Sequence, residues 1–239
     1  MGQPGSPERS RQGGSRGLSR DLIVEYALRS IDLDGTQGLS MRHLAQDLGV
    51  EAMSLYRYVT GREDILEAVV ARLLGGVTDS LDDQLSQTWQ GYLQTLAHTV
   101  RNLALQHPRA FPLVATRHPA APWLRPPLRS IEVVEHFLSS LKGFGFSDDQ
   151  MVGTYRAFSS FLLGQLLLEA AVRGGETSPA EEPLDEGDAQ VSNRDGGVDL
   201  DRDSEVLRLR SMLSEDHGEE EFETSLETLL DRIEMQVSQ

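Results

Sequence analysis

A chain of 239 residues is long enough for a small module and a larger domain, because domains commonly contain about 100–150 residues. The sequence has no cysteine, which excludes disulfide bonds, thiolate nucleophiles and cysteine-based zinc sites. It also has no apolar run near the roughly 18–20 residues that a membrane span needs, since Gly164 and Gln165 interrupt the run Phe161–Leu168. With no secretory signal near the N-terminus, these absences predict a cytoplasmic protein without a membrane partner.

The formal net charge is −16, and its distribution matters more than its size. An acidic protein is a poor partner for nucleic acid, because phosphate binding normally requires a basic surface. Residues 1–75, however, contain nine Arg and ten Asp or Glu, a net charge of −1, so the remaining −15 belongs to residues 76–239. The N-terminal part therefore stays compatible with DNA binding. Four arginines near its start could reach phosphates or simply keep a tail soluble: Arg9, Arg11, Arg16 and Arg20.

The first elements predict a small helical module. Residues 1–17 contain almost nothing apolar and are expected to be a disordered arm. Ser19 is a good helix N-cap, and the apolar positions after it recur at steps of three and four residues, which predicts a helix ending near Gly35. Two short helices and a long one follow, and we assign residues 18–66 to this module. These helices are expected over Met41–Leu48, over Glu51–Val59, and from just after Gly61 to Leu74 or beyond.

The rest of the chain also has the pattern of helices, and no segment shows a convincing period of two that would predict a strand. Five further helices are expected over Thr88–Gln106, Arg109–Thr116, Arg125–Phe144, Asp148–Val172 and Glu219–Val237. Residues 174–205 hold eleven acidic and two basic residues, which predicts an extended acidic loop. The expected fold is all-α, with an N-terminal three-helix helix-turn-helix domain joined by a long helix to a C-terminal helical bundle domain over residues 67–239.

The segment between Met41 and Tyr58 carries the most specific pattern in the chain. Two short helices that cross steeply need a small residue at their contact, and Ala45 supplies one. Gly49 follows the first helix, where a tight turn requires a positive φ. The second helix would then leave one face free for a DNA major groove. A small apolar wedge would hold it at its angle, formed by Leu44, Leu48, Val50 and Leu55.

Residues 38–66, with the sequence GLSMRHLAQDLGVEAMSLYRYVTGREDIL, resemble the tetracycline-repressor (TetR) family. The resemblance extends more weakly over Trp89–His107, Phe161–Glu169 and Phe222–Glu234, which are similar to the C-terminal domain of the subgroup that contains the tetracycline repressor. It implies a homodimer that binds a palindromic operator through its N-terminal domain. It also implies that a small molecule in the C-terminal domain releases the DNA, so we expect a ligand-responsive regulator, and a repressor in particular.

The resemblance also assigns candidate DNA contacts on the two short helices and at the start of the long helix. They are Ser40, Met41, Arg42, Ala52, Met53, Ser54, Tyr56, Arg57, Tyr58 and Arg62. Arg42 could contact a guanine or a phosphate, whereas Ala52 and Met53 offer only apolar contacts, for example to thymine methyl groups. Two positions have a competing explanation, since Tyr56 could be a core aromatic and Arg57 a solvated charge.

Two other classes of function compete with a regulator. None of the six His lies in a recognisable catalytic or metal-binding spacing, and no nucleophile-elbow motif is present, so an enzyme is not expected. We expect no cofactor and no metal site. A helical adaptor that binds proteins instead of DNA is the alternative, and a gel shift with the protein's own upstream region would separate the two.

Two of the predicted helices are candidates for the dimer interface. Asp148–Val172 and Glu219–Val237 each carry an apolar stripe that is long for the surface of a monomer, which predicts a four-helix bundle between two copies. Gly153, Gly164 and Ala170–Ala171 would allow these helices to approach closely.

The C-terminal domain is rich in side chains that could line an effector site, although the same composition suits a core. Its aromatic residues are Trp89, Phe111, Trp123, Phe137, Phe144, Tyr155, Phe158 and Phe161, among others. The candidate ligand contacts are Trp89, Leu96, Val100, Leu113, Trp123, Phe158, Gln165 and Glu169.

The sequence resembles that of a magnesium–tetracycline sensor, but it differs at the positions that would bind the metal ion. Glu169 falls on a candidate magnesium-side carboxylate, but the family's metal-binding histidine falls on Leu113 or Val114 and its drug-binding asparagine on Leu96. Aliphatic side chains offer no lone pair to magnesium, which requires oxygen or nitrogen ligands in near-octahedral geometry. We therefore expect a small, largely apolar effector that binds without magnesium, held by one or two polar groups such as Gln165 or His98.

Overall fold

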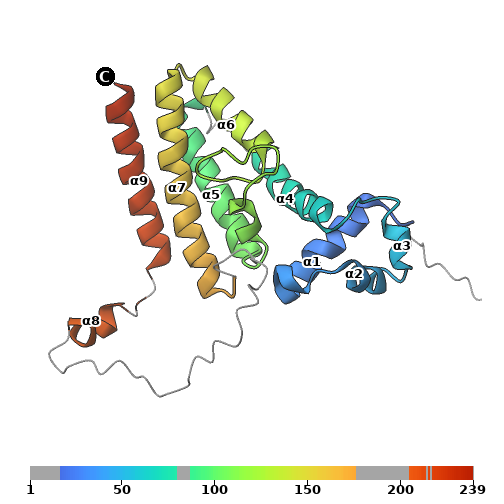
Figure 1. Ribbon diagram of the computed structural model, residues 1–239. Coiled ribbons are helices and arrows are strands. Elements are labelled where there is room, and N and C mark those ends of the chain that lie inside the picture. The colour runs from blue at the N-terminus through green and yellow to red at the C-terminus, as the bar shows by residue number, and fades with distance from the viewer. Residues whose placement is uncertain (1–16, 80–86, 176–204, 214, 216, 239) are drawn as a thin grey trace, which may run out of the picture.

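The computed structural model describes residues 17–79, 87–175, 205–213, 215 and 217–238, and its regular elements over these ranges are all helices (Figure 1). This confirms the all-α fold class. No helix in these ranges is long and apolar enough to cross a membrane. The arm expected over residues 1–17 and the acidic loop expected over 174–205 lie outside the described residues, except at their last or first few positions.

The N-terminal lobe in Figure 1 consists of α1 (Arg20–Gly38), α2 (Met41–Asp47) and α3 (Ala52–Leu55). Ser19 caps α1 as predicted, because its hydroxyl accepts the Leu22 N–H at 3.2 Å. Gly35 interrupts α1 with a φ of 75°, at the position where the helix was expected to end. The buried side chains of these helices, among them Ile23 and Ile31, belong to one apolar cluster that continues into the C-terminal lobe.

The turn between α2 and α3 has the conformation that the sequence predicts. Gly49 has a φ of 66°, which glycine adopts without steric cost. Ala45 is buried at the expected helix contact, and of the wedge Leu44 and Leu55 are buried whereas Leu48 and Val50 are half-buried. Helix α3 is shorter than expected, because the Tyr58 N–H donates to the carbonyl of Leu55, three residues back, and tightens the chain into a turn over residues 56–58.

Helix α4 (Arg62–Asp79) is the predicted long connection between the two lobes (Figure 1). It packs against α1 at one end and against the helices of the C-terminal lobe at the other. Its first turn contains Glu63 and Asp64, whose negative charges are favoured at the positive end of the helix dipole. Any shift of α4 therefore changes the position of the N-terminal lobe relative to the C-terminal lobe.

Helix α7 is the centre of the C-terminal lobe, and its bounds are those expected. It packs against α5, α6, α9 and the short 3-10 helix η3. These elements span α5 (Trp89–Gln106), η3 (Phe111–Ala115), α6 (Ile131–Gly143), α7 (Asp148–Val172) and α9 (Gly218–Val237). Buried residues recur at helical spacing along α7, among them Tyr155, Phe158, Leu162, Leu166 and Ala170.

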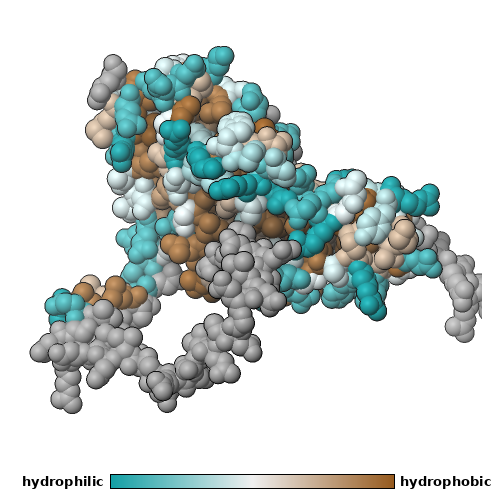
Figure 2. Space-filling model, viewed as in Figure 1, coloured by the Kyte–Doolittle hydropathy of each residue, from teal (hydrophilic) through white to brown (hydrophobic). Residues whose placement is uncertain are grey.

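Two elements of the C-terminal lobe differ from the sequence-based expectation. Helix α6 begins at Ile131 and not at Arg125, because Pro126 and Pro127 lack amide hydrogens and disfavour a helical conformation in the residue before them. Helix α8 (Glu205–Leu213) was not predicted at all. It presents exposed apolar side chains near its end, visible in brown at the lower left of Figure 2.

Candidate nucleic-acid interface and ligand cavity

Helix α3 and the turn after it project exposed side chains from the N-terminal lobe. Leu55 is fully buried and anchors the inner face of the helix, whereas Met53 is 74% exposed. Tyr56, Arg57 and Tyr58 are exposed as well. Tyr56 is therefore not a core aromatic. The surface presents one apolar, two aromatic and one cationic side chain, a combination that can contact both base edges and phosphates.

Helix α2 begins beside this surface. The Ser40 hydroxyl accepts the His43 N–H at 3.1 Å and caps the helix. Arg42 and His43 are exposed in the first turn, so two basic side chains lie on the outside of the lobe. The other candidates from the sequence are half-buried, namely Met41, Ala52 and Ser54.

Arg62 is bound within the protein. Its guanidinium donates to the carbonyl oxygens of Thr36 at 2.8 Å and Leu39 at 3.3 Å. Both carbonyls lie at the end of α1, so Arg62 fixes the connection from α1 to α2 against the start of α4. Arg62 is a candidate DNA contact from the sequence, and the structure adds this second, internal role.

Arg20 also binds within the lobe, although the sequence analysis grouped it with the N-terminal arm. Its guanidinium donates to both carboxylate oxygens of Asp64, at 2.5 and 3.1 Å, and to the Tyr58 carbonyl at 3.0 Å. The hydrogen bond from Arg20, with a further one from the Thr60 N–H, lowers the pKa of Asp64 to about 2. This cluster fixes the turn that follows α3.

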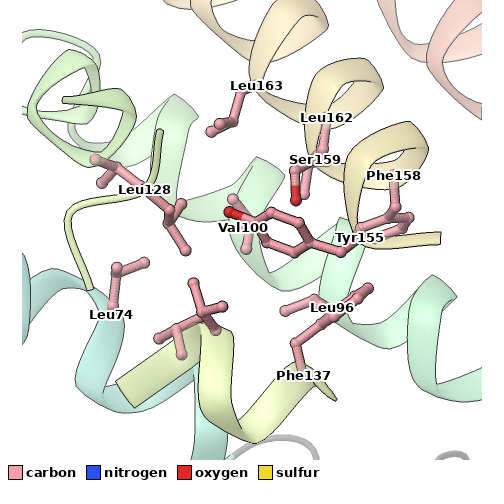
Figure 3. Close-up of a pocket in the computed structure, with 13 residues that line it drawn as sticks. Leu74, Leu96, Val100, Leu128, Phe137, Tyr155, Phe158, Ser159, Leu162 and Leu163 are labelled. Carbon is pink, nitrogen blue, oxygen red and sulfur yellow. The ribbon is translucent and has the colours of Figure 1, made fainter. Parts of the chain in front are cut away.

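An apolar cavity lies in the C-terminal lobe between α4, α5, α6 and α7 (Figure 3). Its volume is about 40 Å³, far below the roughly 300–1,000 Å³ of ordinary ligand pockets. The lining is formed by Leu74, Leu96, Val100, Val114, Leu128, Val133, Val134, Phe137, Tyr155, Phe158, Ser159, Leu162 and Leu163. A drug-sized molecule can enter only if some of these side chains move.

Two hydroxyl groups are the polar side-chain atoms of this lining. The Tyr155 hydroxyl donates to the Pro126 carbonyl at 2.9 Å, and Ser159 lies one turn further along α7. Burial raises the pKa of Tyr155 to about 12, so this hydroxyl stays neutral at physiological pH. A lining without a charged side chain favours an apolar or weakly polar ligand.

Three of the candidate ligand contacts line this cavity, namely Leu96, Val100 and Phe158. Leu113 does not line it, and its neighbour Val114 does. Both alternatives for the position of the family's metal-binding histidine are therefore aliphatic, and only Val114 stands at the cavity.

The two tryptophans lie elsewhere. Trp89 packs edge-on against Phe146, with 5.7 Å between the ring centroids. Trp123 is 74% exposed in the segment before α6. Neither belongs to the lining: Trp89 is the first residue of α5, and Trp123 lies in a non-helical segment.

Gln165 and Glu169 lie on the side of α7 that faces the start of α9. The Glu169 carboxylate accepts hydrogen bonds from Arg101 at 2.9 and 3.2 Å, and Arg173 lies 3.4 Å away. Its side chain is almost fully buried, so both oxygens are committed to guanidinium groups. The part of the chain that the structure describes holds no group of three or more His, Asp or Glu that could bind a metal ion. His98 also lies outside the cavity, 3.5 Å from Glu223.

Sequence reasoning missed the parts of the lining that come from distant segments. Ser159 and Leu162 share one face of α7 with Tyr155 and Phe158, and could have been grouped with them from the predicted helix alone. Leu74 and Leu128 have no such signal, because nothing in their local sequence places them opposite α7.

Comparison with known proteins agrees with this architecture. Residues 83–237 match the family model described as tetracyclin repressor-like, C-terminal domain. The HTH-type transcriptional repressor DrrR1 of Streptomyces coeruleorubidus is 29% identical over 168 residues, which are 69% of this chain and 60% of that repressor. Tetracycline repressor protein class D of Escherichia coli is 27% identical over 221 residues, 92% of this chain and 91% of that protein. The chain thus spans less than two thirds of DrrR1 and most of the class D repressor.

Among solved structures, the TetR family protein ActR of Streptomyces coelicolor in complex with (S)-DNPA has a similar fold. It is 21% identical, with a TM-score of 0.62, and the match covers 92% of this chain and 98% of ActR. The likeness includes both lobes and the helix that joins them.

Proposed function

The chain belongs to the tetracycline-repressor (TetR) family of transcriptional regulators, and we propose that it is a homodimeric repressor that releases a palindromic operator when a small molecule binds. The observation that supports DNA binding best is the contrast on α3 between the buried Leu55 and the exposed Met53, Tyr56 and Tyr58. A helix that is anchored on one face and free on the other can enter a major groove. In this proposal residues 18–66 bind DNA, and residues 67–239 bind the effector and dimerise.

On DNA, the candidate residues divide into base contacts and phosphate contacts. Met53 approaches base edges, with Ala52 and Ser54 beside it, and Tyr56 and Tyr58 donate to phosphate oxygens. Cationic and helix-start groups complete the set, namely Ser40, Met41, Arg42, Arg57 and Arg62. Because Arg62 already holds two carbonyls of α1, its main contribution is to position α2.

The DNA-binding part is tested by selecting duplexes from a random-sequence pool with the full-length protein. We expect a palindromic site to be enriched. If Arg42 contacts a base, Arg42→Ala should weaken binding to that site by about 1–3 kcal/mol. If Arg42 contacts a phosphate instead, the substitution should reduce the slope of log affinity against log salt concentration by about one. Lys142→Ala, an exposed change at the end of α6, is the control and should have no effect. A selection without any enriched site would contradict the proposal.

Helix α7 carries the surface best suited to a second copy. Its exposed side has small residues at Gly153, Ala157, Ser160 and Gly164, followed by Leu168. Within the described part of the protomer, nothing lies within 4 Å of a Cβ built on either glycine. Two helices could approach closely along such a stripe. The expected contribution of Ala170 is wrong, because this residue is buried in the protomer's own core.

The dimer is tested at exposed positions, so that the protomer's core is not damaged. Leu168→Glu combined with Val172→Glu should give a monomer by light scattering at micromolar concentration, and should lose the operator as well, since half-site spacing requires two fixed copies. Leu33→Glu is a matched control on α1, equally exposed and outside the stripe. A wild-type protein that is monomeric under these conditions would contradict the proposed homodimer.

The effector is proposed to be a small, largely apolar molecule that enters the cavity of Figure 3 without magnesium. The apolar lining and the commitment of Glu169 to two arginines support this choice. ActR, which has the same fold, has been crystallised with a small molecule. Calorimetry with magnesium and tetracycline tests whether the effector binds without a metal ion. Sub-micromolar binding that depends on magnesium would contradict the proposal. A compound library screened for a raised melting temperature and for operator release tests the apolar effector.

A further inference from the structure

Several polar contacts bridge the two lobes, among them a hydrogen bond from Arg109 to the Leu33 carbonyl of α1, and two further contacts are considered below. In one, the Arg129 guanidinium donates to the Glu63 carboxylate at 2.9 Å and to the Thr116 hydroxyl at 3.3 Å. In the other, a ring nitrogen of His107 lies 2.8 Å from the Asp32 carboxylate of α1. We call the first contact, made by Arg129 with Glu63 and Thr116, the Arg129 clasp.

Arg129 depends on this clasp. It is only 8% exposed, and its buried Nε has no hydrogen-bond partner. A buried guanidinium that loses its carboxylate is left as an uncompensated charge, which is strongly unfavourable. Glu63, by contrast, is well exposed and can be solvated when it is released. The geometry therefore favours a coupled movement, in which Arg129 and Glu63 stay together when either one is displaced.

The clasp is attached directly to the cavity wall. Leu128, the residue before Arg129, is part of the lining, and the Arg129 N–H donates to the carbonyl of Val114, another lining residue, at 3.0 Å. Leu74 of α4 lies on the same side of the cavity as Leu128 in Figure 3. Because the cavity is too small for an organic effector, an occupant must displace lining residues. Leu128 is half-buried and outside any helix, so it can yield more easily than the residues on α5 and α7.

The other end of the clasp reaches the DNA-binding lobe through the first turn of α4. Three consecutive residues of this turn bind three different segments. Arg62 holds the end of α1, Glu63 holds Arg129, and Asp64 holds Arg20 at the start of α1. A displacement at Glu63 therefore acts on the two bonds that fix α2 and the turn after α3.

We propose that Arg129 is a positioning residue that transmits occupation of the cavity to the DNA-binding lobe through Glu63. The inference rests on the proposed function and adds the path by which the effector site acts on the DNA-binding lobe. An occupant shifts Leu128, the Arg129 clasp pulls on Glu63, and the first turn of α4 changes the placement of α2 and α3. The His107–Asp32 contact is a second tether that does not carry the signal, because neither residue adjoins the lining.

The test uses substitutions that fill the cavity, so that no effector needs to be known. Val100→Phe from α5 and Ser159→Leu from α7 each place additional atoms in the cavity from a separate helix. Operator affinity is measured for each filling variant in the otherwise wild-type chain and in a Glu63→Gln background, using the duplex obtained by selection. Thermal unfolding checks that every variant is folded. Two filling variants are used so that the test still works if one of them does not fold.

We expect a filling variant to weaken operator binding by about tenfold or more in the wild-type background, within the roughly 5–150-fold range of allosteric couplings. In the Glu63→Gln background the same change should have less than about a twofold effect, because the route is cut. Glu63→Gln alone should leave operator affinity nearly unchanged, since Arg62 keeps its bonds to Thr36 and Leu39 and Asp64 keeps Arg20. The Arg62–Glu63 ion pair that it removes, at 3.6 Å, is exposed and contributes little. A merely structural role of the ion pair would not make the effect of cavity filling depend on Glu63.

Asp32→Asn is the matched control, because it breaks a different contact between the lobes and should preserve the tenfold effect. Equal effects of filling with and without Glu63→Gln would overturn the inference and leave the proposed function intact. Loss of operator binding by Glu63→Gln alone would also overturn it, because Glu63 would then hold the lobe and not transmit. Folded filling variants that never change operator affinity would contradict both the inference and an effector-responsive cavity.

Discussion

The two lobes are stabilised in different ways. The C-terminal lobe is held by extensive apolar packing, with Phe111, Phe158, Leu166 and Phe222 almost completely buried. The N-terminal lobe has a smaller core, and its outer elements are fixed by directional bonds from arginines such as Arg20 and Arg62. On the face shown in Figure 2, the N-terminal lobe has a mixed surface, and apolar side chains gather in the middle of the C-terminal lobe. Packing resists displacement strongly, whereas a few directional bonds can be rearranged at a small cost in free energy.

The largest effect is expected in the C-terminal core. Phe222 on α9 is fully buried, stacks on Phe161 with 5.8 Å between centroids, and lies under the Arg101 guanidinium. Phe222→Ala should lower the free energy of unfolding by about 3–5 kcal/mol, because it leaves a cavity between α7 and α9. Urea denaturation measures this loss, and Trp123→Ala, at an exposed ring, should change stability by less than about 0.5 kcal/mol. If Phe222→Ala lowers the free energy of unfolding by less than about 1 kcal/mol, the C-terminal lobe is not stabilised mainly by apolar packing.

A smaller effect is expected at the turn between α2 and α3. Gly49→Val forces a β-branched residue to a φ of 66°, at a cost of about 1–3 kcal/mol, although nothing lies near the added Cβ. Operator binding and amide exchange of α2 and α3 should both report the damage. Gly49→Asn should be better tolerated, since asparagine adopts this conformation more readily. If valine and asparagine behave alike, the positive φ does not determine the geometry of this turn.

The smallest effect is expected at the Arg20–Asp64 pair, and it depends on pH. The folded-state pKa of Asp64, about 2, lies below its ordinary value of 3.8, so the pair stabilises the lobe above pH 4 and this contribution is lost as the pH falls towards 2. Asp64→Asn should cost about 1 kcal/mol at neutral pH, because solvent screens a pair whose Arg20 side chain is 45% exposed.

Urea denaturation of wild type and Asp64→Asn between pH 7 and pH 2 checks this prediction. The difference in stability should be constant down to about pH 4 and should shrink below it. Asp47→Asn, an exposed change in α2, serves as the control. A difference that grows on acidification would show that the carboxylate is not stabilised by Arg20.

The sequence predicted the features that depend on local patterns. The Ser19 cap, the positive φ of Gly49 and the bounds of α7 each follow from a few neighbouring residues, and the structure confirms them. The contacts that shape the candidate sites join residues far apart in the chain. Arg129 and Glu63 are separated by 66 positions, and Arg101 and Glu169 by 68. A single sequence does not show which of many charged residues will meet, so the pairing of Glu169 with Arg101 was not predicted and Arg129 was overlooked.

The only polar side-chain groups in the cavity lining are two hydroxyls, and this affects the range of ligands that the protein would detect. Selection between ligands by apolar contacts is weak, because one methylene group changes binding by only about 1–3 kcal/mol, whereas a site built from hydrogen-bonding partners rejects a ligand without them far more strongly. Here Tyr155 is already engaged with the Pro126 carbonyl and with the Ser159 hydroxyl, so both side-chain hydroxyls of the lining have partners within the protein. Such a protein would respond to a group of compounds that share size and shape, and the genes under its control would answer to a chemical class instead of one metabolite.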